Sequence, residues 1–309
     1  MNELTLSVVI ITYNQEKFIG KTLDSIISQN HNYSYEIVIG DDCSKDKTQE
    51  IIEDYCKRYP GIIKPEYNKS NKGIIKNYFD TITRCKGKYI MDVAGDDWFL
   101  QGKIKKQIDF LERNQDVGMC YGYAEQYFEK LKKIGKKKIG GNTNTFDSLI
   151  IRNEIPAPTI CVRNSLFKKY FLEENPLKQE WLMEDYPMWL WFSLNSRIEM
   201  IKEDFAVYRV QEESASHSKN IEKLLLMEKS ANDVRNYFIK KYNKGTPVEF
   251  DINKQRAFYY ASNFGNSKKE ILNELSKSNN LTRKEKVLKR IWSCNLTLFL
   301  YRLKYLLQK

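Results

Sequence analysis

The sequence predicts an α/β fold around a mostly parallel, Rossmann-like sheet flanked by helices. Two observations lead to this prediction. Short apolar runs rich in β-branched residues alternate along the chain with segments whose apolar residues recur at helical spacing. Polar, acidic turns follow two of those runs. Alternation of this kind builds a parallel sheet whose strands are joined by right-handed helical crossovers.

The expected elements follow the chain in order. An apolar run at 6–12 predicts a buried strand, and Ile19, Leu23 and Ile26 then share one face of a helix expected over 16–29. A polar turn with helix-capping residues at 41–47 separates the next strand from the next helix. The remaining expected strands lie at 36–40, 88–93 and 117–122, and the remaining helices lie around 51–56, 77–85 and 104–111.

Acidic residues follow two of the predicted strands. Asp41 and Asp42 come directly after the strand at 36–40, and Asp96 and Asp97 follow the strand at 88–93. Ligands of open parallel sheets bind beyond the carboxyl ends of the strands, where helix N-termini offer donors to phosphate. Acids at that edge would repel a bare polyanion. A divalent cation bound between them would remove the conflict.

Composition and charge exclude several classes of protein. The 309 residues are 41% hydrophobic and 29% charged, which is typical of a globular chain and not of a disordered one. The net charge of +11 suits nucleic acid, anionic lipid or a phosphorylated substrate, but no nucleic-acid-binding motif accompanies it. A run of lysines over 130–138 beside glycines predicts a solvated loop. We therefore expect no nucleic-acid partner.

Cysteine spacing and hydropathy indicate the cellular compartment in which the protein is expected. The six cysteines are scattered without a C-x-x-C pair, which argues against structural zinc and favours a reducing cytoplasm. The first residues lack the basic region of a signal peptide. The sequence contains no run of about 18 apolar residues, so no membrane-spanning helix is predicted.

Four segments, in this order, resemble family 2 glycosyltransferases. They are Ser7-Val-Val-Ile-Ile-Thr-Tyr-Asn14, Glu36-Ile-Val-Ile-Gly-Asp-Asp-Cys-Ser44, the stretch 87–98 ending in Gly-Asp-Asp-Trp, and Glu184-Asp185. The resemblance covers about 180 residues. It implies a GT-A fold and inverting transfer of a sugar from a nucleoside-diphosphate donor, with UDP as the favoured nucleotide.

The resemblance also implies roles for residues of the nucleotide site. Thr12, Tyr13 and Asn14 would bind the base and ribose, and Asp42 would accept a hydrogen bond from the base. Lys72, within an Asn-Lys-Gly element, would meet a phosphate or remain an ordinary surface lysine. Asp41 reads more simply as a turn residue.

The metal motif departs from the family pattern of acid, any residue, acid. The triplet here is Ala94-Gly95-Asp96, followed by Asp97, so the first acid is missing. Asp96, which would also contact the nucleotide sugar, is the first candidate ligand for Mn²⁺ or Mg²⁺. Asp97 is the second candidate, or else it caps the helix expected from about residue 101.

Inverting transfer needs a base for the acceptor hydroxyl. By resemblance Asp185 has that role, and Glu184 orients it or binds acceptor. The tryptophans around this pair, Trp181, Trp189 and Trp191, could form a sugar platform, but packing in the core is expected. His217 either approaches the metal or is an inert surface side chain.

The resulting prediction is a bacterial, non-processive transferase of surface-polysaccharide biosynthesis acting on a glycan or lipid-linked acceptor. The Gln-x-x-Arg-Trp element of processive synthases is absent from the sequence. A catalytically inactive binding protein of the same fold is the main alternative, since Ala94 weakens the metal motif. A nucleotidyltransferase is a weaker alternative because the turn at 12–16 contains no glycine.

Domain organisation follows from the extent of these motifs. We expect a catalytic domain at 1–215 and a basic, helical C-terminal extension at 216–309. Residues 281–309 combine many basic side chains with leucines at helical spacing. Such a helix can lie on the anionic inner face of the cell membrane, or it can pack on the catalytic domain or on a second copy in a homodimer.

Overall fold

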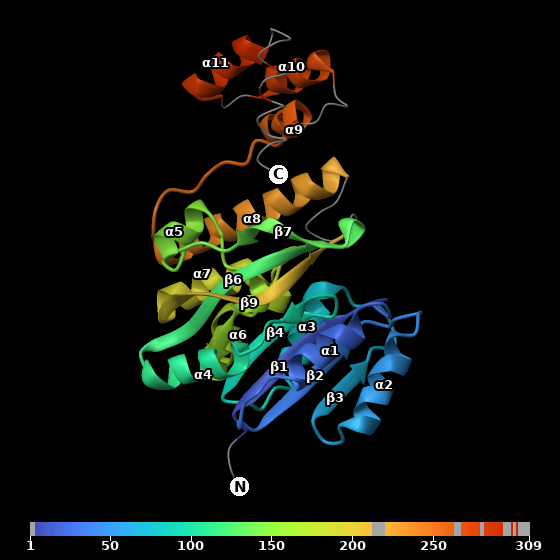
Figure 1. The fold of residues 1–309 in the computed structure, drawn as a ribbon. Helices are drawn as coiled ribbons and strands as arrows, with labels where there is room; N and C mark the ends of the chain where they lie inside the picture. The colour runs from blue at the N-terminus through green and yellow to red at the C-terminus, as the bar shows by residue number, and fades with distance from the viewer. Residues whose placement is uncertain are drawn as a thin grey trace. The chain divides into compact units, whose positions relative to one another are not determined.

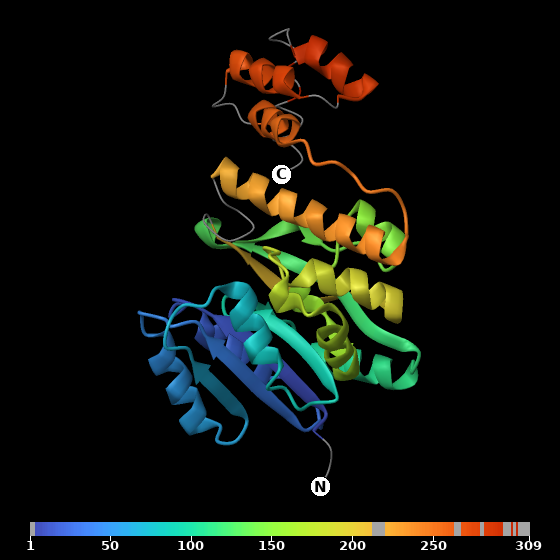
Figure 2. The same ribbon diagram turned by 180° about the vertical axis from the view of Figure 1, so that it is seen from behind.

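The fold is described from a computed structural model, which covers residues 4–211, 220–262, 267–278, 281–292, 298 and 301 (Figure 1). The chain divides into two compact units, Met1–Glu212 and Glu213–Lys309. The first unit holds a sheet flanked by helices, and the second is helical where it is described (Figure 2). This architecture agrees with the predicted α/β class and helical extension.

The sheet of the first unit has a parallel half and a mixed half. Its strand order is β3-β2-β1-β4-β8-β6-β9-β5, and β7 pairs with β6. The first four strands in this order run parallel, as do β6 and β9, whereas β5, β7 and β8 pair antiparallel with their neighbours. The strands are β1 Leu6–Thr12, β2 Tyr35–Asp41, β3 Ile63–Tyr67, β4 Tyr89–Ala94, β5 Trp98–Phe99, β6 Val117–Phe128, β7 Lys133–Ile139, β8 Cys161–Arg163 and β9 Arg197–Val210.

Helices connect these strands and make up the described part of the second unit. Those of the first unit are α1 Ile19–Ile27, α2 Thr48–Arg58, α3 Ile74–Ile82, α4 Lys103–Arg113, α5 Phe146–Ile151, α6 Asn164–Glu174 and α7 Asp185–Asn195. Those of the second are α8 Ile221–Tyr242, α9 Ile252–Ser262, α10 Lys268–Lys277 and α11 Arg283–Trp292.

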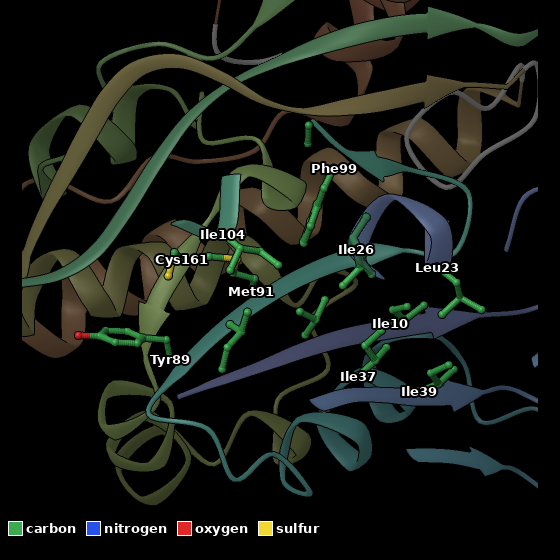
Figure 3. Packing of buried hydrophobic residues seen from close by; sticks show 14 of the residues in the cluster. Ile10, Leu23, Ile26, Ile37, Ile39, Tyr89, Met91, Phe99, Ile104 and Cys161 are labelled. Atoms are coloured by element: carbon green, nitrogen blue, oxygen red, sulfur yellow. The ribbon is translucent and has the colours of Figure 1, made fainter. Parts of the chain in front are cut away.

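The main core lies on one face of β1, β2 and β4. Ile10 and Met91 from the strands meet Leu23 and Ile26 of α1 and Ile104 of α4, and all are fully buried (Figure 3). These are the positions at which the apolar runs and the helical stripes predicted inward side chains. Burial of this apolar surface is the main force that holds the helices on the sheet.

The structure contains strands that the sequence did not predict, namely β3, β5, β8 and β9, and it differs from the prediction in the length of β6 and in one loop. β3 was not expected, because Lys64, Pro65 and Glu66 interrupt its apolar pattern at the sheet edge, where proline is tolerated. β6 extends well beyond residue 122. The lysine-rich segment is solvated as expected, but 133–139 forms strand β7 and not a loop, and its charges suit an exposed strand.

The second unit packs α9, α10 and α11 around their own apolar cluster. Trp292 is 1% exposed, and its ring lies 5.4 Å from that of Phe258 and 4.9 Å from that of Tyr301. Leu288 packs against the same cluster. These two apolar residues of the tail therefore face protein. The other tail leucines, Leu296, Leu300, Leu303 and Leu307, lie outside the described residues. None of the helices described has the length and hydropathy required to span a membrane.

Close backbone contact between β1 and the turn before β4 makes Gly87 sensitive to substitution. A Cβ at Gly87 would lie 2.4 Å from the Ser7 backbone nitrogen and 2.5 Å from the Leu6 carbonyl carbon. We predict that Gly87→Ala lowers the free energy of unfolding in urea by about 1–3 kcal/mol. In the control Gly20→Ala, the new Cβ would meet no atom closer than 3.6 Å, and that variant should be neutral or up to about 1 kcal/mol more stable. Equal stability of the two variants would contradict the prediction.

Candidate active site

Three parallel strands bring the predicted site residues to one edge of the sheet. In the β1 register, Thr12 lies opposite Asp41 of β2, and Ile11 lies opposite Ala94 of β4. The turns after these strands are hydrogen-bonded to β1 as well, since Asp42 donates its backbone N–H to the Thr12 carbonyl at 2.9 Å and Gly95 donates to Ile11 at 3.0 Å. The carboxyl ends therefore converge as the sequence predicted.

The turn after β1 is tied to the turn after β2 by Asn14. Asn14 adopts a left-handed conformation with φ of 52°, which asparagine tolerates better than most residues. Its side-chain oxygen accepts from the Lys45 backbone N–H at 2.7 Å, and its own N–H donates to Ser44 Oγ at 2.9 Å. Tyr13, between Thr12 and Asn14, is 46% exposed at this edge. Asn14 therefore joins the two turns through hydrogen bonds, whereas the Tyr13 side chain is exposed to solvent.

Asp41 is a structural turn residue, as its spacing suggested. Its carboxylate accepts from the Ser44 backbone N–H at 3.0 Å and from the Ser44 hydroxyl. It also accepts from the Gln49 side chain at 2.5 Å. With these donors the carboxylate holds the turn that leads into α2.

Asp42 anchors the loop that carries Lys72. The two carboxylate oxygens of Asp42 accept backbone N–H bonds from Lys72 at 2.8 Å and from Gly73 at 2.9 Å. Asn68 adds a side-chain bond at 3.1 Å. The Lys72 ammonium pairs with Asp80 at 2.8 Å. The structure thus brings Asp42 and Lys72 together, with the carboxylate holding the loop and the ammonium directed to Asp80.

Asp96 lies in the turn after β4 and is held by the end of β9. Its Oδ2 accepts from the Gln211 amide at 2.6 Å, and its carbonyl accepts from Arg209 Nε at 2.7 Å. Burial raises the pKa of the Asp96 carboxyl above its ordinary value, against the hydrogen bond from Gln211. Position 94, where the family pattern has an acid, is an alanine at the end of β4.

Asp97 makes a different set of contacts. It is buried, its Oδ1 accepts the Arg209 backbone N–H at 2.7 Å, and its carbonyl accepts from Thr22 Oγ1 at 2.6 Å. The expectation that Asp97 caps the following helix is wrong, because α4 follows Gly102 and has no side-chain cap. Burial raises the pKa of Asp97, and the charge of Asp96 raises it further. Asp97 is therefore the less suitable of the two candidate metal ligands.

Arg209 is the residue that fastens this turn to β9. Its guanidinium is 6% exposed, pairs with Glu129, and lies 4.4 Å from the Phe18 ring centre and 4.9 Å from that of Trp98. The sequence analysis did not single out Arg209 as a site residue, because its partners are distant in the chain. Within the described part of the chain, no three His, Cys, Asp or Glu side chains form a ready-made metal cage.

Glu184 and Asp185 lie at the start of α7. The Asp185 carboxylate accepts the Tyr186 backbone N–H at 2.6 Å, so it occupies the donor-rich helix N-terminus. Burial raises the pKa of Asp185. Burial first, and then the charges of Asp185 and Asp92, raise the pKa of Glu184 to about 8. At neutral pH the Glu184 carboxyl is therefore mainly protonated.

The aromatic neighbours of this pair belong mainly to the core. Trp189 and Trp191 are fully buried, which confirms their packing role, whereas Trp181 is partly exposed. His217 lies outside the described residues.

One acid near this pair was missed by the sequence analysis. Asp92 is buried in β4, and Tyr78 of α3 donates to its Oδ2 at 2.8 Å. Burial raises the pKa of Asp92 to about 7, with a further contribution from the charge of Asp185. The signal was present as an acid inside the apolar run 88–93, but the run was read only as a strand.

Comparisons with known proteins agree with this geometry. Residues 7–175, more than half of the chain, match the model of Glycosyl transferase family 2. An uncharacterized protein of Mycobacterium tuberculosis is 27% identical over 225 residues, which cover 69% of this chain and 61% of that protein. TuaG of Bacillus subtilis, named as a teichuronic acid biosynthesis glycosyltransferase, is 29% identical over 119 residues, covering 38% of this chain and 46% of TuaG.

The solved structure of S. aureus TarS residues 1–349 in complex with UDP has the same fold. It superposes with a TM-score of 0.56 at 18% identity, covering 88% of this chain and 81% of that one. A complex of the same protein with UDP-GlcNAc superposes with a TM-score of 0.57 at 16% identity, over 97% of this chain and 89% of that one. With the family match over 7–175 and a GT-A architecture, the chain belongs to glycosyl transferase family 2.

Proposed function

We propose that this glycosyltransferase moves one sugar per encounter, with inversion, from a UDP-sugar to a glycan or lipid-linked acceptor of a surface polysaccharide. One observation carries the proposal. The turns after β1, β2 and β4 converge at the edge where the strands end. The acid pair with raised pKa values at the start of α7 adds support. Perturbed acids of this kind are typical of sites that move protons.

The nucleotide end of the proposed site is formed by the first two turns. Thr12 ends β1, Tyr13 and Asn14 follow it, and Asp42 orders the backbone N–H groups of the loop at 71–73. Tyr13 offers an exposed ring to stack on a planar base. TarS, which has the same fold, has been solved with UDP and with UDP-GlcNAc, and this favours UDP as the nucleotide.

The transfer step is a single displacement with Asp185 as the base. The acceptor oxygen forms a bond to the anomeric carbon as the bond from that carbon to the diphosphate oxygen breaks. The proton of the acceptor hydroxyl passes to the Asp185 carboxylate. Glu184, protonated at neutral pH, adds no second negative charge beside the base.

The Asp96 carboxylate suits a divalent cation that binds together with the diphosphate. Mg²⁺ sites of this kind take one or two carboxylates together with phosphate oxygens and water, so one partly exposed carboxylate is sufficient. Asp96 would hold the ion, while Asp97 and Arg209 keep the turn in place. When bound, Mn²⁺ or Mg²⁺ would neutralise charge on the leaving diphosphate.

The acceptor class and the location rest on other observations. The similarity to TuaG favours a polysaccharide acceptor. The proposal places the enzyme at the cytoplasmic face of the membrane, and this part rests on the basic side chains of the tail, because Leu288 and Trp292 pack within the second unit. A catalytically inactive binding protein remains the competing hypothesis, supported by Ala94, and measurable hydrolysis of UDP-sugars would exclude it.

We predict that Asp185→Asn lowers kcat by about 10²–10⁴-fold, because the substitution keeps the side-chain shape and removes the proton acceptor. Affinity for UDP, measured by calorimetry, should stay within about twofold. In the unmodified enzyme kcat/KM should fall on the acid side as Asp185 gains a proton, with a midpoint above the usual aspartate range near pH 4, since its pKa is raised.

Glu184→Gln is the matched control for this prediction. Because Glu184 has a pKa of about 8, glutamine imitates its state at neutral pH, and the variant should lose much less activity than Asp185→Asn at pH 6–7. If Asp185→Asn turned over at a near-normal rate, Asp185 would not be the base.

We also predict that Asp96→Ala removes stimulation by Mn²⁺ or Mg²⁺ and weakens the binding of Mn²⁺ in the presence of UDP, because the ion loses its carboxylate ligand. Electron paramagnetic resonance of free Mn²⁺ measures that binding directly. Asp80→Asn, which removes the acid paired with Lys72, is the control and should leave Mn²⁺ binding unchanged. Full activity of the wild-type enzyme in excess EDTA would contradict the metal assignment.

A further inference from the structure

Asp92 lies on the opposite face of β4 from the main core. Side chains alternate along a strand, and Met91 and Val93 both belong to the buried cluster formed with α1 and α4 (Figure 3). Asp92 therefore projects to the other face, the same face as Ala94. Two residues further along the chain, Asp96 begins the contacts with β9.

One oxygen of Asp92 is buried without a hydrogen-bond partner. The residue is 7% exposed, and its Oδ2 accepts from the Tyr78 hydroxyl at 2.8 Å. Among the residues that the structure describes, none bonds to Oδ1. Buried carboxylate oxygens are nearly always bonded, because an unpaired one loses its hydration without compensation. As far as the structure describes the chain, Asp92 Oδ1 therefore has a free acceptor site that a ligand donor can fill.

The protein's own nearby cation does not serve this oxygen. Lys103 of α4 is fully buried and acts electrostatically on Asp92, but its ammonium donates to Gln107 Oε1 at 2.6 Å and to the Ile160 carbonyl at 2.9 Å. The other ionisable groups that act on Asp92 are Tyr78 and Asp185, and Asp92 in turn acts on Glu184 and Asp97. The acids among these cannot donate when ionised, and the Tyr78 hydroxyl is already used on Oδ2.

The place of Asp92 on β4 suits a contact with the transferred sugar of the proposed reaction. If the diphosphate lies by Asp96 and the attacking hydroxyl by Asp185, the sugar ring must lie between them, because inversion requires attack opposite the leaving group. Asp92 is on the strand that leads to Asp96, and it is electrostatically coupled to Asp185. A sugar ring offers hydroxyl donors there, while the base and ribose are bound at the turns after β1 and β2.

We propose that Asp92 Oδ1 accepts a hydrogen bond from a hydroxyl of the transferred sugar, with Tyr78 fixing the carboxylate through Oδ2. Asp92 is then a specificity-determining residue for the donor sugar. The inference rests on the proposed use of a UDP-sugar. It adds the identity of a side chain that recognises the sugar. A site built to bond one hydroxyl rejects an analogue that lacks it, because the buried acceptor is then left unpaired.

Calorimetric titration of the full chain with UDP and with UDP-sugars tests this proposal. UDP lacks the sugar, so Asp92→Ala should bind it within about twofold of the wild-type affinity. The best-bound UDP-sugar should bind Asp92→Ala about 10- to 100-fold more weakly than it binds the wild type, as expected for a lost bond to a charged group. Tyr78→Phe, which leaves the carboxylate less well oriented, should show a smaller loss that again affects the UDP-sugar alone.

If Asp92→Ala does not fold, analogues of that UDP-sugar that each lack one hydroxyl provide a second test. One deoxy analogue should bind the wild type more weakly than its parent sugar, and Asp92→Asn or Tyr78→Phe should reduce that difference. Equal losses for UDP and UDP-sugar, or no loss for either, would overturn the proposal for Asp92. If the wild-type protein bound neither UDP nor any UDP-sugar, the proposed function itself would fail, and the two outcomes are distinct.

Discussion

The parallel pairing of β1 with β2 on one side and with β4 on the other is the constraint on which the site depends. It places Thr12 beside Asp41 and Ile11 beside Ala94, so that turns separated by about eighty residues of chain start from the same edge. The hydrogen bonds that Asp42 and Gly95 donate to β1 extend this register beyond the strands. The core under that edge is closely packed and resists displacement of the strands, so the turns keep their relative positions.

The acids described above differ in what their contacts do, although Asp185 also accepts a backbone N–H bond and burial also raises the pKa of Asp97. Asp41, Asp42 and Asp97 accept backbone N–H bonds that hold turns or β9 in place. Asp92 and Glu184 lie in surroundings that raise their pKa values to about 7 and about 8, and burial also raises the pKa of Asp185. Acids of the first kind organise the site. Those of the second kind keep the capacity to exchange a proton or bind a hydroxyl group, as a transferase requires.

Arg209 links the two halves of the sheet at the site. Arg209 of β9 contacts the Asp96 carbonyl, the Asp97 carboxylate and Glu129, which lies in the segment after β6. The Phe18 and Trp98 rings flank the guanidinium, which favours a buried arginine over a lysine at this position. Position 94 lacks the acid of the family pattern, but the acids that remain, Asp96 and Asp97, are held by an extensive set of contacts.

Much of this could be predicted from the sequence, and the remainder could not for identifiable reasons. The apolar runs and helical stripes determined the α/β class and the strands β1, β2 and β4, because burial on both faces of a strand leaves a continuous apolar run and burial of one helix face leaves a helical period. The motif residues determined the family and located the acids. Only the tertiary structure decided which partners each acid has. The donors to Asp42 come from residues 68–73, those to Asp97 from β9, and the neighbours of Asp92 from α3 and α7, and no local pattern records such distant partners. A carboxylate's role is set by the donors and charges that folding brings to it, and the sequence specifies these only through the whole fold.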